Sequence, residues 1–574
     1  MKKQISKTFF ITIIFFGIFG LAESSEAATY YVATNGNDSN SGAQSAPFKT
    51  IQKAANIMVA GDTVYIRAGT YVERVTPQHS GAAGNYIAFQ NYGSEEVWIE
   101  SPNLSATDCA ICMGGSPATS HIKFKGLKFR NTNWAQIFIN GESYAKNNII
   151  FDGVTSNGSM YNYYLVNGVS NVQIINGTMY GNQFGTTIVT SNNILIDNNE
   201  VSYSTIDGIY VTDWGSGHPT DITITNNNVH HNSRQGILVT QVDRANVANN
   251  HSYYNGATGI QIEAVSSKGS NNLVKNNICE YNGVTYDGET GIWVDDTDNA
   301  TVENNIVRYN KNGIYVTGSE NVIVRKNQIY GNTKYYTLLM YASPQFGVSK
   351  HTKIIHNVIY NNAGTGGVLR IGASGDSAWS ENSRFFNNIV SDNTNTYEVY
   401  RNGGTTNQLN YNDYYTGSFY AYWSALYMSL NSYQTGTSQD LNSFNADPKF
   451  VDKANLNFNI LSDSPCINAG DFLTRTTGSS IGTVIPVADA KYFHDGYGIA
   501  GVSGDTIRVG SNTATITDID YGANTITVGR SISWNNGDGV SYAYSGSRPD
   551  IGAYEYVSAD DTTPPVAPTN LSVQ

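Results

Sequence analysis

Residues 222–240 read ITITNNNVHHNSRQGILVT, and residues 245–263 read ANVANNHSYYNGATGIQIE. The two stretches align on two asparagines five residues apart and on a later glycine. Across the chain the first asparagine column is Asn199, Asn227, Asn250, Asn277, Asn305, Asn327, Asn357 and Asn388, and the second is Asn232, Asn255, Asn282, Asn310, Asn332, Asn362 and Asn393. Repeats of about 20 to 50 residues are typical of solenoids, in which each unit buries its apolar face against its neighbours.

The glycine opens a second repeated phrase, Gly-Ile-x-Val or close to it. The phrase occurs at Gly208–Val211, Gly236–Val239, Gly259–Ile262, Gly291–Val294 and Gly313–Val316. Its period of two predicts a short strand whose apolar residues face one way and whose intervening residues face the other. The repeats contain no helical stretch for a crossover. We therefore predict an all-β parallel β-helix, with the asparagines stacked into amide ladders at equivalent turns.

The segments outside the repeats predict how the solenoid begins and ends. Residues 47–58 carry apolar side chains at helical spacing, which favours a short N-terminal capping helix over the first coil. Alternating runs at Thr506–Val509 and Thr525–Val528 indicate a small C-terminal β insertion. The predicted organisation is a signal peptide over 1–27, the capped β-helix over 28–470, the insertion over 471–547, a closing segment over 548–559, and over 560–574 a Pro-rich linker followed by what resembles the start of a fibronectin type III domain.

The N-terminus and the composition indicate an exported protein. Lys2, Lys3 and Lys7 precede an apolar stretch, and Ser25-Glu26-Ala27 is a small-residue cleavage site. No later apolar run is long enough to span a bilayer. We expect a secreted or cell-surface monomer, or a part of a longer multidomain surface protein. The net charge of −13 argues against nucleic acid as a partner, and an acidic polysaccharide would need a bridging cation.

The 4 cysteines are too few for a disulfide scaffold. Cys109 and Cys112 could pair or bind metal, but no second CxxC supports a zinc site. Cys279 and Cys466 are interpreted as buried apolar residues.

The two ends of the chain resemble a known group of proteins. The N-terminal segments YYVATNGN (30–37), PFKTI (47–51) and GDTVYI (61–66), together with RPDIGAYE (548–555), are similar to the ends of family 9 pectate lyases and β-helical glycosidases. The chain thus resembles secreted right-handed parallel β-helix proteins of the pectate-lyase-like superfamily. The resemblance implies a single-stranded right-handed parallel β-helix and a polysaccharide partner, neutral or acidic. It specifies the fold better than the reaction, because non-enzymatic surface proteins share these signatures.

The catalytic motif of family 9 lyases is mostly not matched. Asp207-Gly208-Ile209 matches the first Asp-Gly strand, but Arg234-Gln235-Gly236 stands where an Asp-Asp-Gly strand is expected, and Gln261 stands at the lysine position. Tyr210 and Asp213, followed by His218, are loosely similar to the Tyr-x-x-Asp-Pro-His strand of alginate epimerases, without the Asp-Pro-His run itself.

The strand register places two acids together on the outside of the solenoid. Four positions after the five successive strand glycines stand Thr212, Thr240, Glu263, Asp295 and Thr317, and two positions after the same glycines stand Tyr210, Leu238, Gln261, Trp293 and Tyr315. Neighbouring strands lie about 4.8 Å apart. We therefore expect Glu263 and Asp295 side by side near Trp293, with Asp296, Asp213 and Asp207 close to them.

This arrangement allows two kinds of chemistry. Adjacent carboxylates hold one proton tightly, as a glycosidase requires for a proton donor and a nucleophile or base. Alternatively, Glu263, Asp295, Asp296 and Asp207 could bind Ca²⁺ and bridge it to a uronate for β-elimination, with Arg234 or His218 as base. Tyr210, Trp293, Tyr315 and Gln261 would contact the sugar rings.

Simpler explanations exist for the same residues. Residues 294–299 also read as an ordinary Asx-rich turn, and outward aromatic residues are common on β surfaces. Two further functions stay open besides hydrolysis and elimination. One is a non-catalytic surface, adhesion or glycan-binding protein, and the other is uronate C5-epimerisation.

Overall fold

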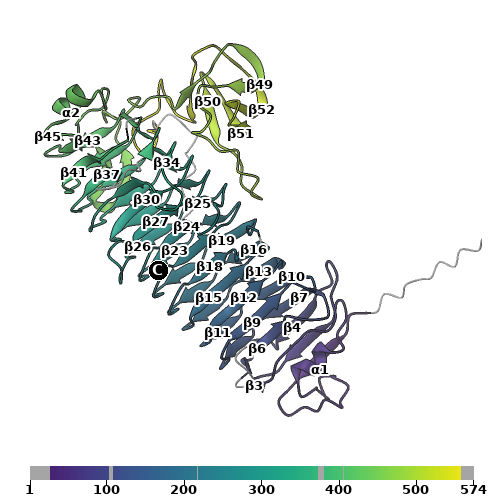
Figure 1. Cartoon of the computed structure of the whole chain (residues 1–574). Helices are drawn as coiled ribbons and strands as arrows, with labels where there is room; N and C mark the ends of the chain where they lie inside the picture. Colours follow the sequence, from purple (N-terminus) through teal and green to yellow (C-terminus); the bar gives the residue numbers. More distant parts are fainter. Residues whose placement is uncertain (1–25, 102–107, 216, 373–379, 405, 558–574) are drawn as a thin grey trace, which may run out of the picture.

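Three long parallel sheets form the body of the molecule (Figure 1). The computed structural model describes residues 26–101, 108–215, 217–372, 380–404 and 406–557. Sheet 1 has 15 strands, from β1 (Thr29–Val32) to β42 (Gln408–Asn410); sheet 2 has 14, from β3 (Gly69–Val72) to β43 (Asp413–Tyr415); and sheet 3 has 14, from β6 (Cys109–Met113) to β45 (Leu426–Tyr427). Nearly every pairing in these sheets joins a strand to its counterpart one turn later, so the predicted parallel β-helix is confirmed.

Both predicted asparagine ladders are present inside the turns. Asn277 shows the pattern: its Oδ1 accepts from the backbone N–H and the side-chain Nδ2 of Asn250, at 2.9 and 3.1 Å. Its Nδ2 donates to Asn305 Oδ1 at 3.0 Å and to the Val247 carbonyl at 2.9 Å. The first ladder continues one turn further than predicted, to Asn412. Each buried amide therefore satisfies backbone groups that the turn would otherwise leave unpaired.

The repeated glycine is needed because two chain segments approach closely. A Cβ on Gly259 would lie 2.7 Å from both Asn282 Nδ2 and the Gly291 carbonyl oxygen. The second asparagine ladder therefore fills the space that a side chain would occupy. Directly after each glycine, Ile260, Ile292 and their counterparts enter the core.

The N-terminal helix is shorter than the sequence predicts. The structure has a single turn, α1 (Ile51–Ala55), where apolar spacing predicted a helix over 47–58. Thr50 caps it by accepting from the Lys53 N–H, and Ile51, Ala54 and Ala55 are buried in the main core. A capping role for this helix stays a prediction.

A six-stranded antiparallel sheet follows the solenoid, within the predicted insertion. Its order is β48 (Thr474–Arg475), β53 (Gly539–Tyr542), β50 (Thr506–Val509), β51 (Asn512–Asp520), β52 (Thr525–Trp534) and β49 (Ser480–Pro486). It lies beside the C-terminal half of the solenoid in Figure 1. The helix α2 (Leu430–Thr437) and the short 3₁₀ helix η1 (Lys453–Asn455) lie between the solenoid strands and this sheet in the sequence.

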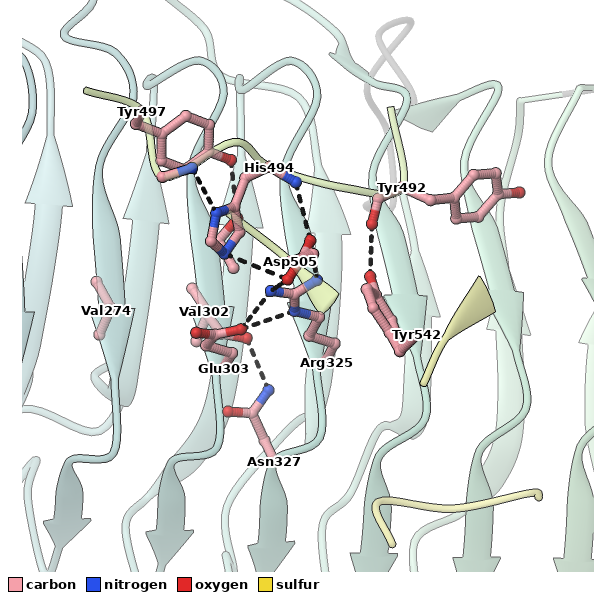
Figure 2. Close-up of polar contacts among 12 residues, drawn as sticks. Val274, Val302, Glu303, Arg325, Asn327, Tyr492, His494, Tyr497, Asp505 and Tyr542 are labelled. Atoms are coloured by element: carbon pink, nitrogen blue, oxygen red, sulfur yellow. Dashed lines mark hydrogen bonds and ion pairs between the residues drawn. The ribbon is translucent and has the colours of Figure 1, made fainter. Parts of the chain in front are cut away.

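A buried arginine joins the six-stranded sheet to sheet 1. Arg325 ends β31 (Ile323–Arg325), and its guanidinium lies between Glu303 and Asp505 (Figure 2). It donates to Glu303 Oε2 at 2.5 and 2.8 Å, and to the two Asp505 carboxylate oxygens at 2.6 and 2.8 Å. The Tyr542 ring packs against the same guanidinium, with 4.4 Å from Cζ to the ring centroid. The network fixes the smaller sheet against the solenoid.

The remaining sequence predictions concern the cysteines and the termini. Cys109 and Cys112 form a disulfide, which decides between the two alternatives left open by the sequence. Cys279 and Cys466 are free and buried, as expected. The predicted signal peptide, up to Ser25, and the segment after Val557 lie outside the described residues. Within the described part of the chain, no helix has the length and apolar character needed to cross a membrane.

Candidate functional site

Glu263 and Asp295 end adjacent strands of sheet 3. Glu263 is the last residue of β24 (Ile260–Glu263), and Asp295 is the last residue of β27 (Thr290–Asp295). The register pairs Gln261 with Trp293, and the Ala264 N–H donates to the Asp295 carbonyl at 3.1 Å. Between these residues, Ile262 and Val294 enter the core. The predicted placement of both acids on the outer face of neighbouring strands is confirmed.

A groove of about 360 Å³ opens beside Asp295. Its lining comes from β27, from β30 (Asn312–Thr317), from β33 (Leu338–Tyr341) and from the turn after β33. The lining residues are Trp293, Asp295, Asp296, Tyr315, Thr317, Leu339, Tyr341, Ser343 and Pro344. The groove thus combines the carboxyl groups of Asp295 and Asp296 with three aromatic rings, a composition typical of carbohydrate-binding sites. Glu263 is not one of its lining residues and lies on the strand next to Asp295.

Asp295 keeps a large protonated fraction near neutral pH. Burial, together with the nearby charges of Asp296 and Glu263, raises its pKa to about 7, while a hydrogen bond from Thr317 opposes the shift. The Thr317 hydroxyl donates to Asp295 Oδ1. Oδ2 has no hydrogen-bond donor among the described residues. A proton on Oδ2 would therefore be available to a ligand in the groove.

Glu263 has more hydrogen-bond donors than Asp295. The Thr240 hydroxyl donates to Oε1 at 3.0 Å, and the Gln261 side-chain amide donates to Oε2 at 2.8 Å. Burial raises the pKa of Glu263, and the Thr240 hydrogen bond opposes the shift. Because both of its oxygens accept hydrogen bonds, Glu263 is better suited than Asp295 to carry the negative charge.

Asp207 and Arg234 form the edge of the acid cluster toward the N-terminus. Arg234 Nε lies 3.8 Å from Asp207 Oδ1, which also accepts from the Gln235 N–H at 3.1 Å. Burial raises the pKa of Asp207 to about 6, and Arg234 opposes the shift. The Gln235 amide donates to Gln261 Oε1 at 3.1 Å. Gln261, predicted to contact sugar, therefore also links Gln235 to Glu263.

Asp213 and His218 belong to a separate network. His218 Nδ1 lies 3.2 Å from Asp243 Oδ2, and its Nε2 lies 2.7 Å from the Ser267 hydroxyl. The Gln241 amide donates to the same hydroxyl at 3.1 Å and to Asp213 Oδ2 at 3.4 Å. Neither Asp213 nor His218 lines the groove, and His218 has both ring nitrogens engaged elsewhere.

The predicted calcium ligands do not converge on one point. Asp296 has a left-handed backbone with φ of 55°, and its Oδ2 accepts from the Ser343 hydroxyl at 2.7 Å. Among the described residues, the one group of three acidic, His or Cys ligand atoms within 4.8 Å is Glu303, His494 and Asp505. Arg325 already supplies positive charge to the two carboxylates of that group (Figure 2).

The three aromatic residues predicted to contact sugar differ in their exposure and in whether they line the groove. Trp293 and Tyr315 line the groove, with ring centroids 5.9 Å apart, but the Tyr315 side chain is only 5% exposed. Tyr210 lies outside the groove and stacks on Phe184 at 6.1 Å.

Several residues of the groove were missed by sequence reasoning. Leu339, Tyr341, Ser343 and Pro344 come from β33 and its following turn, and Leu338–Tyr341 lacks the Gly-Ile-x-Val phrase that located the other strands. The apolar period of that strand was the signal available. Thr240 and Thr317 were placed in the correct row, but their hydrogen bonds to the acids follow from side-chain geometry.

Comparison with family models gives two matches along the solenoid. Residues 30–192 match the Pel9A-like, right-handed β-helix region, and residues 264–414 match the right-handed β-helix region. A Bacillus subtilis protein described as uncharacterized protein YwoF is 26% identical over 454 residues, covering 76% of this chain and 91% of that protein. Pectate lyase PEL9 of Emericella nidulans is 36% identical over 83 residues, covering 14% of this chain and 20% of the lyase.

The solved structures that match this chain do so at low sequence identity and with TM-scores below 0.5. The complex of XylC with xylose covers 89% of this chain and 99% of its own at 12% identity and a TM-score of 0.38. The crystal structure of pectate lyase Pel9A covers 92% and 97% at 14% identity and a TM-score of 0.30. The matched regions and the three-sheet solenoid identify the chain as a right-handed β-helix protein of the pectate-lyase-like superfamily.

Proposed function

We propose that this protein is a secreted enzyme that hydrolyses glycosidic bonds of a polysaccharide on the outer face of sheet 3, where the groove beside Asp295 adjoins the strand that carries Glu263. Asp295 donates a proton from Oδ2 to the leaving glycosidic oxygen as the bond to the anomeric carbon breaks. Glu263, ionised, attacks that carbon, and water then releases the sugar with return of the proton to Asp295. Adjacent strands lie about 4.8 Å apart, close to the carboxyl separation of about 5–5.5 Å in retaining glycosidases.

One observation carries this proposal. Asp295, with a pKa of about 7, lies on the strand next to Glu263, and the two carboxyl groups differ in their donors. Environments that favour the proton on one carboxyl and the charge on the other are what an acid and nucleophile pair requires. Trp293 supplies an apolar face against which a sugar ring can pack, and the nearly buried Tyr315 ring lies beside it.

Calcium-assisted elimination is a second candidate, because Arg234, the candidate base, lies at the edge of the acid cluster, 3.8 Å from Asp207. The oxygen donors suit Ca²⁺ chemically, but they do not gather as a group of three, so we derive no step through calcium.

A digestion of a broad glycan panel by the full chain tests the proposal. We expect new reducing ends without the ultraviolet absorbance of an unsaturated uronate. Unsaturated products would indicate elimination, altered stereochemistry without chain shortening would indicate epimerisation, and binding without any product would indicate a non-catalytic glycan-binding protein.

A further inference from the structure

Arg370 lies on the same outer face as the groove, one strand beyond it. It belongs to β37 (Gly367–Ile371), where the register pairs it with Leu339 on one side and Tyr400 on the other. Leu339 lines the groove, so Arg370 continues the row of Trp293, Tyr315 and Leu339. Three strand spacings separate Trp293 from Arg370, or about 14 Å.

Two tyrosine rings hold the guanidinium in place. Its Cζ lies 4.3 Å from the ring centroid of Tyr400 and 4.9 Å from that of Tyr336, and its Nε donates to the Gly372 carbonyl at 2.8 Å. A Cβ on Gly366 would lie 2.1 Å from Tyr336 Cε1, so glycine makes room for that ring. The Arg370 side chain is therefore positioned without an acidic partner among the described residues.

The two terminal nitrogens of Arg370 differ in their hydrogen-bond partners from those of Arg325, which joins the six-stranded sheet to sheet 1. Arg325 donates through Nε, Nη1 and Nη2 to two carboxylates. Arg370 is similarly buried, at 8% exposure, yet its Nη1 and Nη2 have no acceptor among the described residues. Among the described residues, the fully buried nitrogen atoms without a hydrogen-bond partner include Arg401 Nε but neither Nη atom of Arg370. Since both Nη atoms also lack a partner among these residues, they must be accessible to solvent. The open end of the fork can therefore bind an external anion.

A row of neighbouring aromatic rings, in which Tyr315 is nearly buried, leads from the acids toward this fork. Tyr315 lies 5.9 Å from Trp293 and 6.4 Å from Tyr336, and beyond Arg370 the Tyr400 and Tyr422 rings stack at 5.0 Å. A sugar chain lying along sheet 3 would thus pass from Asp295 over aromatic rings to a preorganised guanidinium.

We propose that Arg370 binds a sugar carboxylate of the substrate, a few residues from the bond that is cleaved. This inference rests on the proposed function and specifies its substrate class, a uronate-containing polysaccharide. A planar guanidinium binds a carboxylate through two parallel N–H···O bonds. The protein carries a net charge of −13, but the Arg370 guanidinium provides a positive charge at this position. A sugar carboxylate could therefore bind here without a bridging cation.

Binding measurements on the full chain carrying Asp295→Asn test this subsite separately from catalysis. The probes are hexasaccharides of galacturonate, mannuronate, guluronate and glucuronate, each compared with its carboxyl-reduced neutral counterpart by calorimetry. We expect at least one uronate to bind roughly tenfold or more tightly than its neutral counterpart, as one charge-assisted pair would provide. Adding Arg370→Gln should abolish this preference, and Arg370→Lys should restore part of it.

Arg244→Gln, which removes a half-buried arginine paired with Asp221, serves as the matched control and should leave the preference unchanged. Unchanged affinity for the neutral hexasaccharide and an unchanged melting temperature in Arg370→Gln would show that the fold and the aromatic surface are intact. A preference that survives Arg370→Gln, or no preference for any uronate, overturns the proposal. Cleavage by the unmutated chain is read separately: hydrolysis of neutral glycans alone would refute the subsite and leave the proposed hydrolysis standing.

Discussion

The Trp293 indole N–H donates to the Thr317 hydroxyl oxygen at 2.8 Å. The register pairs Trp293 with Tyr315 and Asp295 with Thr317 on neighbouring strands, so the indole reaches diagonally across the sheet. Because its oxygen accepts this bond, the Thr317 hydroxyl is oriented to donate its own proton to Asp295 Oδ1. The aromatic wall of the groove and the proton donor are thereby one hydrogen-bonded unit.

Thr317→Val should shift the pH profile of the enzyme to higher pH. The Thr317 hydrogen bond stabilises the Asp295 anion, so its removal raises the pKa of Asp295 above about 7. Hydrogen bonds to charged groups are worth about 1.5–3 kcal/mol, and about 1.4 kcal/mol corresponds to one pKa unit, so we expect the alkaline limb of kcat/KM to move up by about one unit. The measurement is kcat/KM against pH.

Thr187→Val is the matched control for that change. Thr187 lies on the same sheet, in β15 (Phe184–Val189), and its enclosed hydroxyl has no hydrogen-bond partner in the part of the chain that the structure describes. Its replacement should leave the alkaline limb in place. An unshifted limb in Thr317→Val would show that Asp295 is not the group that titrates.

Asp295→Asn and Glu263→Gln should each reduce kcat on a natural glycan by about 10²–10⁴-fold, the range typical of lost acid–base catalysis. Both variants keep the size of the side chain, so KM should change little. Glycans with an activated leaving group need less proton donation and should restore much of the Asp295→Asn rate but not the Glu263→Gln rate. Full activity in both variants would place the site elsewhere.

The sequence predicted the parts of the site that depend on register alone. The Gly-Ile-x-Val phrase repeats once per turn, and strand alternation then places Glu263 and Asp295 on the same face, as observed. Side chains that turn toward loops could not be placed this way. His218 was a candidate base, but contacts with Asp243 and Ser267, far apart in the sequence, direct it away from the groove.

Arg370 was missed for a related reason. In Gly367–Ile371 the glycine lies one residue earlier relative to the apolar positions than in the repeated phrase, so the register could not be transferred. Likewise, α1 was predicted too long because apolar spacing over 47–58 reports burial, and Met58 is buried without being helical. Burial and helix length are separate properties of that segment.

Replacing Asp295 should also change how the stability of the fold depends on pH. The pKa of Asp295 is about 7 in the folded protein, above its ordinary value of 3.8, so folding favours the protonated form. That contribution is complete below pH 3.8 and is lost as the pH rises through about 7. The free energy of unfolding of Asp295→Asn should therefore exceed that of the unmutated chain at pH 8 and nearly equal it at pH 4. Chemical denaturation at the two pH values measures the difference. An equal difference at both pH values would contradict the raised pKa.

Asn277→Ala should destabilise the solenoid strongly. The substitution removes the amide that bonds Asn250, Asn305 and the Val247 carbonyl, leaving several buried groups unpaired at about 1–3 kcal/mol each. We expect a loss of several kcal/mol in the free energy of unfolding. Asn431→Ala, on the exposed side of α2, is the control and should change it by less than about 0.5 kcal/mol.

Arg325→Met should loosen the six-stranded sheet from the solenoid. Glu303 and Asp505 would keep their charges without a partner, a situation that costs about 3–5 kcal/mol in buried ion pairs. Hydrogen exchange should accelerate in β50 and β53 more than in β24 and β27. Arg244→Met breaks the more exposed pair with Asp221 and should cost about 0–1 kcal/mol. Equal effects of the two substitutions would show that the junction does not depend on Arg325.

The most direct test of the proposed hydrolysis uses a glycan that the unmutated chain cleaves. The glycan is digested in ¹⁸O-labelled water, and the products are analysed by mass spectrometry. Hydrolysis by Glu263 and Asp295 predicts one ¹⁸O atom at each new reducing end in the unmutated chain, and no labelled product from the Glu263→Gln, Asp295→Asn double variant. Products that carry a double bond and no label, or labelled products from the double variant at the unmutated rate, would contradict the claim.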